Sequence, residues 1–202
     1  MTDHEYSVVG HSRSQIGRYL AIAAALASSA LVALGTWWSQ IVVQFGLPPW
    51  SNFVATPVSA AAIYVSLHFL FNKWGWCIAF YFLGLPNISG TWACSGETRG
   101  DDNAVIYEWN GTVTISQTWE KIRVTLRTEQ SSSRSVSAAL IPDGDRWMLM
   151  YSYRNEPRAG EPLNPHLGYC ELSFLSKYKR AEGDYFTARG RGSFGRMTLE
   201  RV

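Results

Sequence analysis

The chain has 202 residues, a formal net charge of +2, and 47% hydrophobic and 17% charged residues. This near-neutral balance argues against a surface for polymeric nucleic acid, which normally carries a strong basic patch. The three cysteines, Cys77, Cys94 and Cys170, include no Cys-x-x-Cys pair. We therefore predict neither a disulfide framework nor a zinc site, but reduced and buried thiols in a cytosolic domain.

Charge is distributed very unevenly along the chain. From Tyr19 to Gly96 the only formally charged side chain is Lys73, whereas acidic and basic residues are frequent in the remainder. Such a contrast separates a part solvated by lipid from a part solvated by water. We predict a transmembrane module over residues 1–84 and a polar domain over 85–202, which is large enough to close one modest core.

Two apolar runs are candidates for membrane-spanning helices. The first covers residues 19–38, which matches the roughly 20 residues that a helix needs to cross the hydrocarbon layer. It contains small residues such as Ala25 and Ser29, which let helices in lipid approach closely. The second span is predicted over residues 53–72, after a turn that contains glycine and prolines.

The few charges near these spans predict the orientation. Arg13 and Arg18 precede the first span, Lys73 follows the second, and the connecting turn has no charge. The positive-inside rule then places both termini and the polar domain in the cytoplasm. The apolar segment 74–83 is too short to cross the bilayer, so we interpret it as an interfacial continuation of the second helix.

After Pro86 the hydrophobic pattern changes to a period of two, which is typical of strands. Eight segments show it, at about 88–98, 107–118, 121–130, 134–141, 146–154, 167–176, 182–189 and 194–201. Short turns between strands favour an antiparallel meander, and a long meander tends to close because closure removes exposed edges. We predict an all-β, eight-stranded up-and-down barrel with room inside for one small ligand.

The first predicted strand contains Gly90-Thr91-Trp92, and the last one ends at Arg201. This arrangement resembles the Gly-x-Trp signature of lipocalin-like (calycin) barrels. In that family the tryptophan plugs the closed end of the barrel, and an arginine of the last strand packs across it through a cation–π contact. The resemblance implies structural roles for Gly90, Trp92 and Arg201.

A wider combination resembles a family of bacterial CBASS effectors (cyclic-oligonucleotide-based antiphage signalling). It consists of two N-terminal spans, the Leu-Pro-x-Ile-x-Gly-x-Trp exit, the eight strands and the glycine-rich ending RGRGSFGRMTLE. The resemblance implies that the barrel binds a cyclic di- or oligonucleotide second messenger. It also implies that the helices then form a homo-oligomer and disrupt the bacterial inner membrane, which causes abortive infection. The lipid bilayer is thus a further partner, and no cofactor is expected besides the activating ligand.

A cyclic dinucleotide presents two bases and two phosphates, so its site needs stacking faces together with cations or hydroxyls. If Trp92 faces inward, strand parity places several aromatic side chains inside the barrel. The candidate ligand-binding residues are Tyr107, Trp109, Tyr151, Tyr153 and Arg189. Parity alone does not separate a ligand contact from a ring that fills the core.

The sequence of the polar domain gives little support to an enzymatic function. Its single histidine, His166, suggests no Ser-His-Asp order, and neither a phosphate-cradling loop nor a metal-ligand cluster is present in the sequence. We therefore predict no catalytic or metal residues. Two alternatives stay open: a membrane-tethered lipocalin-like carrier or sensor of an apolar ligand, and a structural anchor that recruits a cytosolic partner.

Overall fold

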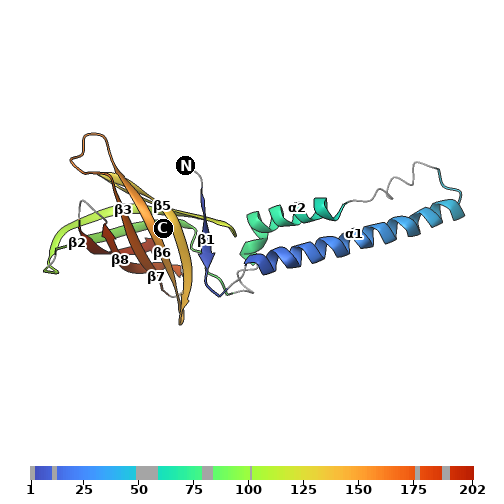
Figure 1. Ribbon diagram of the computed structural model, residues 1–202, viewed down its shortest axis with the longest axis horizontal. Helices are drawn as coiled ribbons and strands as arrows, with labels where there is room; N and C mark the ends of the chain where they lie inside the picture. Colours follow the sequence, from blue (N-terminus) through green and yellow to red (C-terminus); the bar gives the residue numbers. More distant parts are fainter. Residues whose placement is uncertain are drawn as a thin grey trace. The chain divides into compact units, whose positions relative to one another are not determined.

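The computed structural model describes residues 3–10, 13–48, 59–78, 84–100, 102–175, 178–187 and 192–202. The chain divides into two compact units (Figure 1). The β unit comprises Met1–His11 and Cys77–Val202, and the helical unit comprises Ser12–Trp76.

The helical unit contains α1 (Arg13–Gln44) and α2 (Ala60–Leu70), which lie side by side (Figure 1). Ala24 of α1 is buried. Among the described residues, α1 is the one helix long and apolar enough to cross a membrane, from Ser14 to Gln44. The predicted first span, 19–38, lies inside this longer helix.

The second predicted span is only partly described. Ser59 caps the N-terminus of α2, with its Oγ accepting a hydrogen bond from the backbone N–H of Ala62 at 3.2 Å. α2 continues into a π-helical turn, η2 (Phe71–Gly75). Residues 53–58 of the predicted span lie outside the described residues, so a second crossing stays a prediction.

The described residues of the β unit form nine strands. They are β1 (His4–Val8), β2 (Gly90–Arg99), β3 (Val105–Gln117), β4 (Lys121–Thr128), β5 (Ser131–Asp143), β6 (Arg146–Pro157), β7 (His166–Phe174), β8 (Arg180–Thr187) and β9 (Phe194–Arg201). From β2 to β9 each strand pairs antiparallel with the next, and β9 returns to β2, so the sheet closes into a barrel. Each of the eight predicted segments overlaps one of β2–β9.

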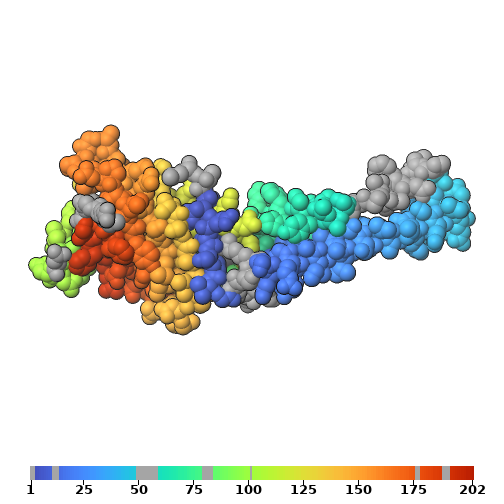
Figure 2. Space-filling view, viewed as in Figure 1, coloured from blue at the N-terminus to red at the C-terminus, as the bar shows by residue number. Residues whose placement is uncertain are grey.

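The predicted number of eight strands is corrected by β1. This strand runs antiparallel to β4 and parallel to β5, where Tyr6 is opposite Ala138. Figure 2 shows β1, in blue, against β5 on the surface of the barrel. β4 and β5 pair directly only from Thr125↔Arg134 to Arg127↔Ser132, and β1 pairs with both beyond that point. The segment His4–Val8 has only five residues, so its strand conformation depends on these two neighbours.

β5 has an irregularity close to the point where β1 inserts between β4 and β5. The register between β5 and β6 shifts between Ser135 and Ser137. There the Ser135 hydroxyl accepts a hydrogen bond from the backbone N–H of Val124 at 2.9 Å. His4 Nε2 lies 2.7 Å from the same oxygen. Where β1 separates β4 from β5, the Ser135 hydroxyl thus takes the place of a backbone carbonyl as the acceptor for a β4 N–H.

Trp92 closes one end of the barrel. Its side chain is 0% exposed, and its Nε1 donates to the carbonyl of Ile88 at 3.2 Å. Phe174 packs edge-on at 5.4 Å between ring centroids. The Arg201 guanidinium lies 5.3 Å from the Trp92 ring and donates to the carbonyl of Ser89. The end of β9 and the start of β2 are thus joined across the Trp92 ring, which plugs this end of the barrel.

Candidate functional site

A cavity of about 290 Å³ lies in the barrel away from Trp92. It is bounded by the end of β2, the start of β3, the β4–β5 turn, the end of β6, the start of β7 and the β8–β9 turn. Its volume is at the lower end of the range of about 300–1,000 Å³ typical of small-molecule pockets. The lining includes Thr98, Tyr107, Trp109, Thr128, Ser133, Tyr151, Tyr153, Asn155, His166, Tyr185 and Thr187.

Two inward-facing glycines give the aromatic rings their positions. A Cβ at Gly96 would overlap the ring of Trp109, and a Cβ at Gly168 would overlap the ring of Tyr153. Each ring therefore lies against the backbone of the neighbouring strand instead of crossing the lumen. The glycines thereby leave space between rings that would otherwise fill the barrel.

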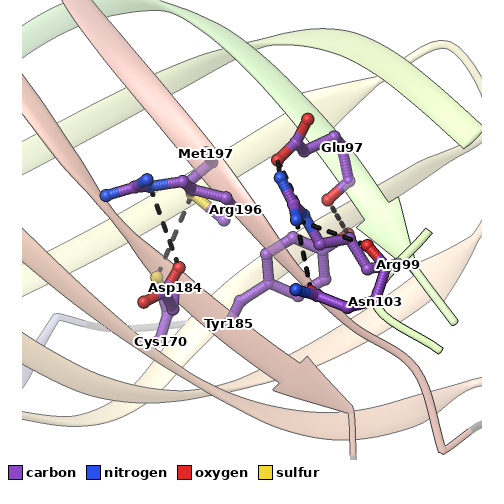
Figure 3. Close-up of polar contacts among 8 residues, drawn as sticks. All are labelled: Glu97, Arg99, Asn103, Cys170, Asp184, Tyr185, Arg196 and Met197. Carbon is purple, nitrogen blue, oxygen red and sulfur yellow. Dashed lines mark hydrogen bonds and ion pairs between the residues drawn. The ribbon is translucent and has the colours of Figure 1, made fainter. Parts of the chain in front are cut away.

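Tyr185 holds Trp109 in place. Trp109 Nε1 donates to Tyr185 Oη at 3.2 Å, and the two rings meet edge-on at 5.9 Å. Tyr185 Oη is also 2.7 Å from Thr98 Oγ1 and donates to the carbonyl of Glu97 at 3.4 Å. Figure 3 shows Tyr185 beside Glu97 and Arg99. The indole is thus oriented by hydrogen bonds as well as by packing.

Below the aromatic rings the interior is neutral. Tyr151 and Cys170 are buried, and Cys170 Sγ lies 4.0 Å from Met197 Sδ (Figure 3). Burial raises the pKa of the Cys94 and Cys170 thiols to about 12. Burial, with Cys170 as a further cause, also raises the pKa of Tyr151 well above its usual value. These groups carry no charge near neutral pH, so a charged part of a ligand would be disfavoured at this depth.

The charges that line the described part of the cavity are acidic. Glu108 and Glu129 contribute to its wall, and this part of the lining contains no lysine or arginine. The predicted cation, Arg189, lies outside the described residues. Thr187 and Ser193, which flank its segment on either side, both line the cavity.

The ion pairs near this end of the barrel belong to its outer surface. Arg99 pairs with Glu97 at 2.5 Å and donates to Asn103 Oδ1 at 3.2 Å. Asp184 and Arg196, drawn in Figure 3, are 4.0 Å apart and largely exposed. Exposed pairs of this kind contribute little to stability. Within the described residues no group of three or more His, Cys, Asp or Glu could hold a metal ion.

Four of the five predicted ligand-binding residues line one cavity. Tyr107 lies at its mouth with 46% exposure, Trp109 is half-buried, and Tyr151 and Tyr153 are buried. Whether these rings touch a ligand stays a prediction.

Other lining residues were not among the predicted candidates. Asn155 continues the inward-facing row of Tyr151 and Tyr153 on β6, so strand parity could have identified it. Ser133 and His166 could be grouped with Asn155 only from the strand register.

Comparison with known proteins matches both parts of the chain. Residues 83–201 match the family described as Cap15, cyclic dinucleotide receptor domain, and residues 14–77 match Cap15, TM helices. A curated relative from Yersinia aleksiciae, CD-NTase-associated protein 15, is 39% identical over 100% of this chain and 99% of the relative. The chain therefore belongs to the Cap15 family of CBASS effectors, which join N-terminal transmembrane helices to a C-terminal cyclic dinucleotide receptor domain.

Proposed function

We propose that this chain is a ligand-gated membrane effector. A cyclic dinucleotide binds in the barrel cavity, and the bound state favours association of the membrane helices of several copies. The assembled helices disrupt the bacterial inner membrane, so that an infected cell dies before phage spreads. The chain acts through binding and assembly, without catalysis.

The observation that carries the proposal is the aromatic cavity inside the segment that matches a cyclic dinucleotide receptor domain. Rings held against the wall, such as Trp109 and Tyr153, present faces on which bases stack. The hydroxyl groups of Thr98 and Thr187 also line the rim, where they hydrogen-bond with Tyr185 and Ser193. A cavity of about 290 Å³ takes one nucleotide unit deeply and leaves the other near the mouth.

The segment between β8 and β9, next to the mouth of the cavity, supplies a candidate group for binding the phosphates. Residues 188–191 include Arg189, and the residues on both sides of this segment line the cavity. Guanidinium groups bind phosphate through charge-assisted hydrogen bonds. In the proposed complex Arg189 contacts a phosphate at the mouth, while the bases occupy the aromatic interior.

The membrane part of the proposal has two crossings, α1 and the segment 53–72. Both termini and the barrel are cytoplasmic in this arrangement, in keeping with the positive-inside rule. The boundary between the membrane module and the receptor is placed between residues 84 and 85, with one amendment: β1 belongs to the receptor. Ala25 and Ser29 are exposed on α1 within the helical unit, which supports a role in contacts between copies.

In this proposal nucleotide binding is coupled to assembly through a shift of population between an unassembled and an assembled state. The nucleotide favours assembly only by the difference in its affinity for the assembled and unassembled states. Couplings of about 1–3 kcal/mol per site are typical. Repetition of this coupling around an oligomer sharpens the response.

The lining of the cavity argues against the alternative, a carrier of an apolar ligand. Hydroxyl, carboxamide and carboxylate groups alternate with the aromatic rings around its wall. An acyl chain in the cavity would leave the Asn155 carboxamide and the Ser133 hydroxyl, which form no hydrogen bond with any described residue, unsatisfied.

The proposed function is tested with the full chain in detergent and in liposomes. Thermal stability is followed during titration with cyclic dinucleotides and, in parallel, with a fatty acid. Binding should stabilise the fold by about 2.7 kcal/mol at 100-fold excess over Kd. The same nucleotide should release a trapped dye from liposomes. Stabilisation by the fatty acid alone, or dye release that is independent of nucleotide, would refute the proposal.

A further inference from the structure

The carboxamide of Asn155 is buried and has no hydrogen-bond partner among the described residues. Asn155 is 6% exposed, lines the cavity, and its side chain forms no hydrogen bond with any described residue. More than nine in ten buried polar groups in native proteins are hydrogen-bonded, and the exceptions call for a specific explanation. An amide that faces a cavity and lacks a partner is such an exception.

Asn155 is part of a polar row that crosses three strands. It is opposite Ser133 of β5 and opposite His166 of β7. All three side chains line the cavity. Ser133 is 7% exposed, and its hydroxyl likewise has no hydrogen-bond partner in the described part of the chain. His166 Nδ1 lies 3.1 Å from the carbonyl of Asn164. The other ring nitrogen, Nε2, is therefore the one that can bond to a ligand.

An aromatic ring lies next to this row. Tyr153 is the preceding inward-facing residue of β6, and its ring meets that of His166 edge-on at 6.5 Å. A planar heterocycle stacked on Tyr153 would present its edge to the residue that follows on the same face of the strand, Asn155. Stacking face and hydrogen-bonding edge are the two features by which proteins recognise an unpaired base.

We infer that Asn155 reads the edge of one base of the bound cyclic dinucleotide, with Ser133 as a second contact. This inference rests on the proposed function and adds the residue that sets base preference. A carboxamide offers one donor beside one acceptor. Adenine presents the complementary pair through its N6 amino group and N7, whereas guanine presents two acceptors, O6 and N7, at the same edge. At this edge the carboxamide therefore favours adenine over guanine.

A binding role for Asn155 would also explain why a buried amide that lowers the stability of the ligand-free protein is present at this position. A leucine has a similar volume, and it would remove the unsatisfied polar group from the interior. Ligand-binding residues often reduce the stability of the empty protein in this way. Asn155→Leu should thus raise the melting temperature of the ligand-free protein while it weakens binding.

The test measures Kd for cyclic di-AMP and cyclic di-GMP by calorimetry on the full chain in detergent. Wild type should bind cyclic di-AMP more tightly. Asn155→Leu should weaken cyclic di-AMP binding by about 5- to 150-fold, the equivalent of about 1–3 kcal/mol for a bidentate base contact. Its effect on cyclic di-GMP should stay within about twofold. Glu156→Ala, which alters the exposed neighbour on the same strand, is the matched control.

The outcomes separate the inference from the proposed function. If wild type binds no cyclic dinucleotide, the proposed function fails. If wild type binds but Asn155→Leu binds both rings as tightly as wild type, only the inference fails. Asn155→Ser serves as a second variant with a smaller side chain. If both variants lower the ligand-free melting temperature, Asn155 is a structural residue and the inference is overturned.

Discussion

Gln117 Nε2 donates a hydrogen bond to Tyr6 Oη at 3.1 Å, which joins β3 to β1 inside the barrel. The same carboxamide accepts from the backbone N–H of Ile88 at 3.0 Å and donates to the carbonyl of Pro86 at 3.3 Å. The chain runs between the β unit and the helical unit twice, after β1 and before Leu85. One buried side chain therefore joins β1 to the segment that leads into β2.

Gln117→Leu should lower the free energy of unfolding by about 1–3 kcal/mol, because it leaves the buried N–H of Ile88 without its acceptor. Thermal melting followed by tryptophan fluorescence measures the change. Ser116→Ala, at the exposed neighbour on β3, is the control and should have little effect. A melting temperature equal to that of wild type would show that the hydrogen bonds of Gln117 do not stabilise the barrel.

Arg201→Ala should destabilise the barrel by about 1–2 kcal/mol through loss of the cation–π contact with Trp92 and the hydrogen bond to Ser89. Nucleotide affinity should not change, since the cavity lies away from Trp92. Arg196→Ala on the same strand removes an exposed arginine and serves as control. Equal losses of stability in the two variants would remove the case for a special role of Arg201.

Trp109→Ala and Tyr153→Ala should each weaken cyclic dinucleotide binding by about 5- to 150-fold, as expected for loss of a stacking face worth about 1–3 kcal/mol. Tyr169→Ala is the control, because Tyr169 faces outward and contacts Phe186 at 5.3 Å between centroids. Calorimetric titration gives the affinities. If the Tyr169 variant loses as much affinity as the other two, the ligand does not bind in the barrel cavity.

The stability of the β unit should fall as pH rises from about 9 towards 12. The buried thiols of Cys94 and Cys170, with their pKa raised from 9.0 to about 12, keep their protons in the fold, whereas the unfolded chain releases them. Each thiol should add a slope of about 1.4 kcal/mol per pH unit in this interval. Urea denaturation between pH 7 and 10 measures it. Cys170→Ala should reduce the slope and the exposed Cys77→Ala should not; the reverse order would contradict this assignment.

The double variant Ala25→Leu, Ser29→Leu should abolish nucleotide-dependent dye release and leave nucleotide affinity unchanged. Both positions are exposed on α1, and larger side chains there prevent close approach of a second helix. Ala23→Leu with Ala30→Leu enlarges a different exposed face of the same helix and is the control. Dye release that persists in the first variant but not in the control would place the contact on the other face.

Much of the barrel could be predicted because its information is local. Alternation along each strand placed eight segments, all of which overlap β2–β9, and parity correctly oriented Trp92, Val113 and Tyr151 towards the interior. The same parity on β6 extends to Asn155. That its carboxamide has no hydrogen-bond partner among the described residues, however, depends on atoms of other strands and could not be inferred from the sequence.

The sequence by itself determined the change from an apolar to a charged segment near residue 85 and the strand period, because each follows from residues close together in the chain. The order of these segments along the chain was enough for the resemblance to CBASS effectors. Only the tertiary structure revealed that β1 joins the wall, because a segment of five residues becomes a strand through hydrogen bonds supplied by β4 and β5. It likewise decided that Ser133, Asn155 and His166 form one row. Register between distant strands is a property of the closed barrel, and no single strand encodes it.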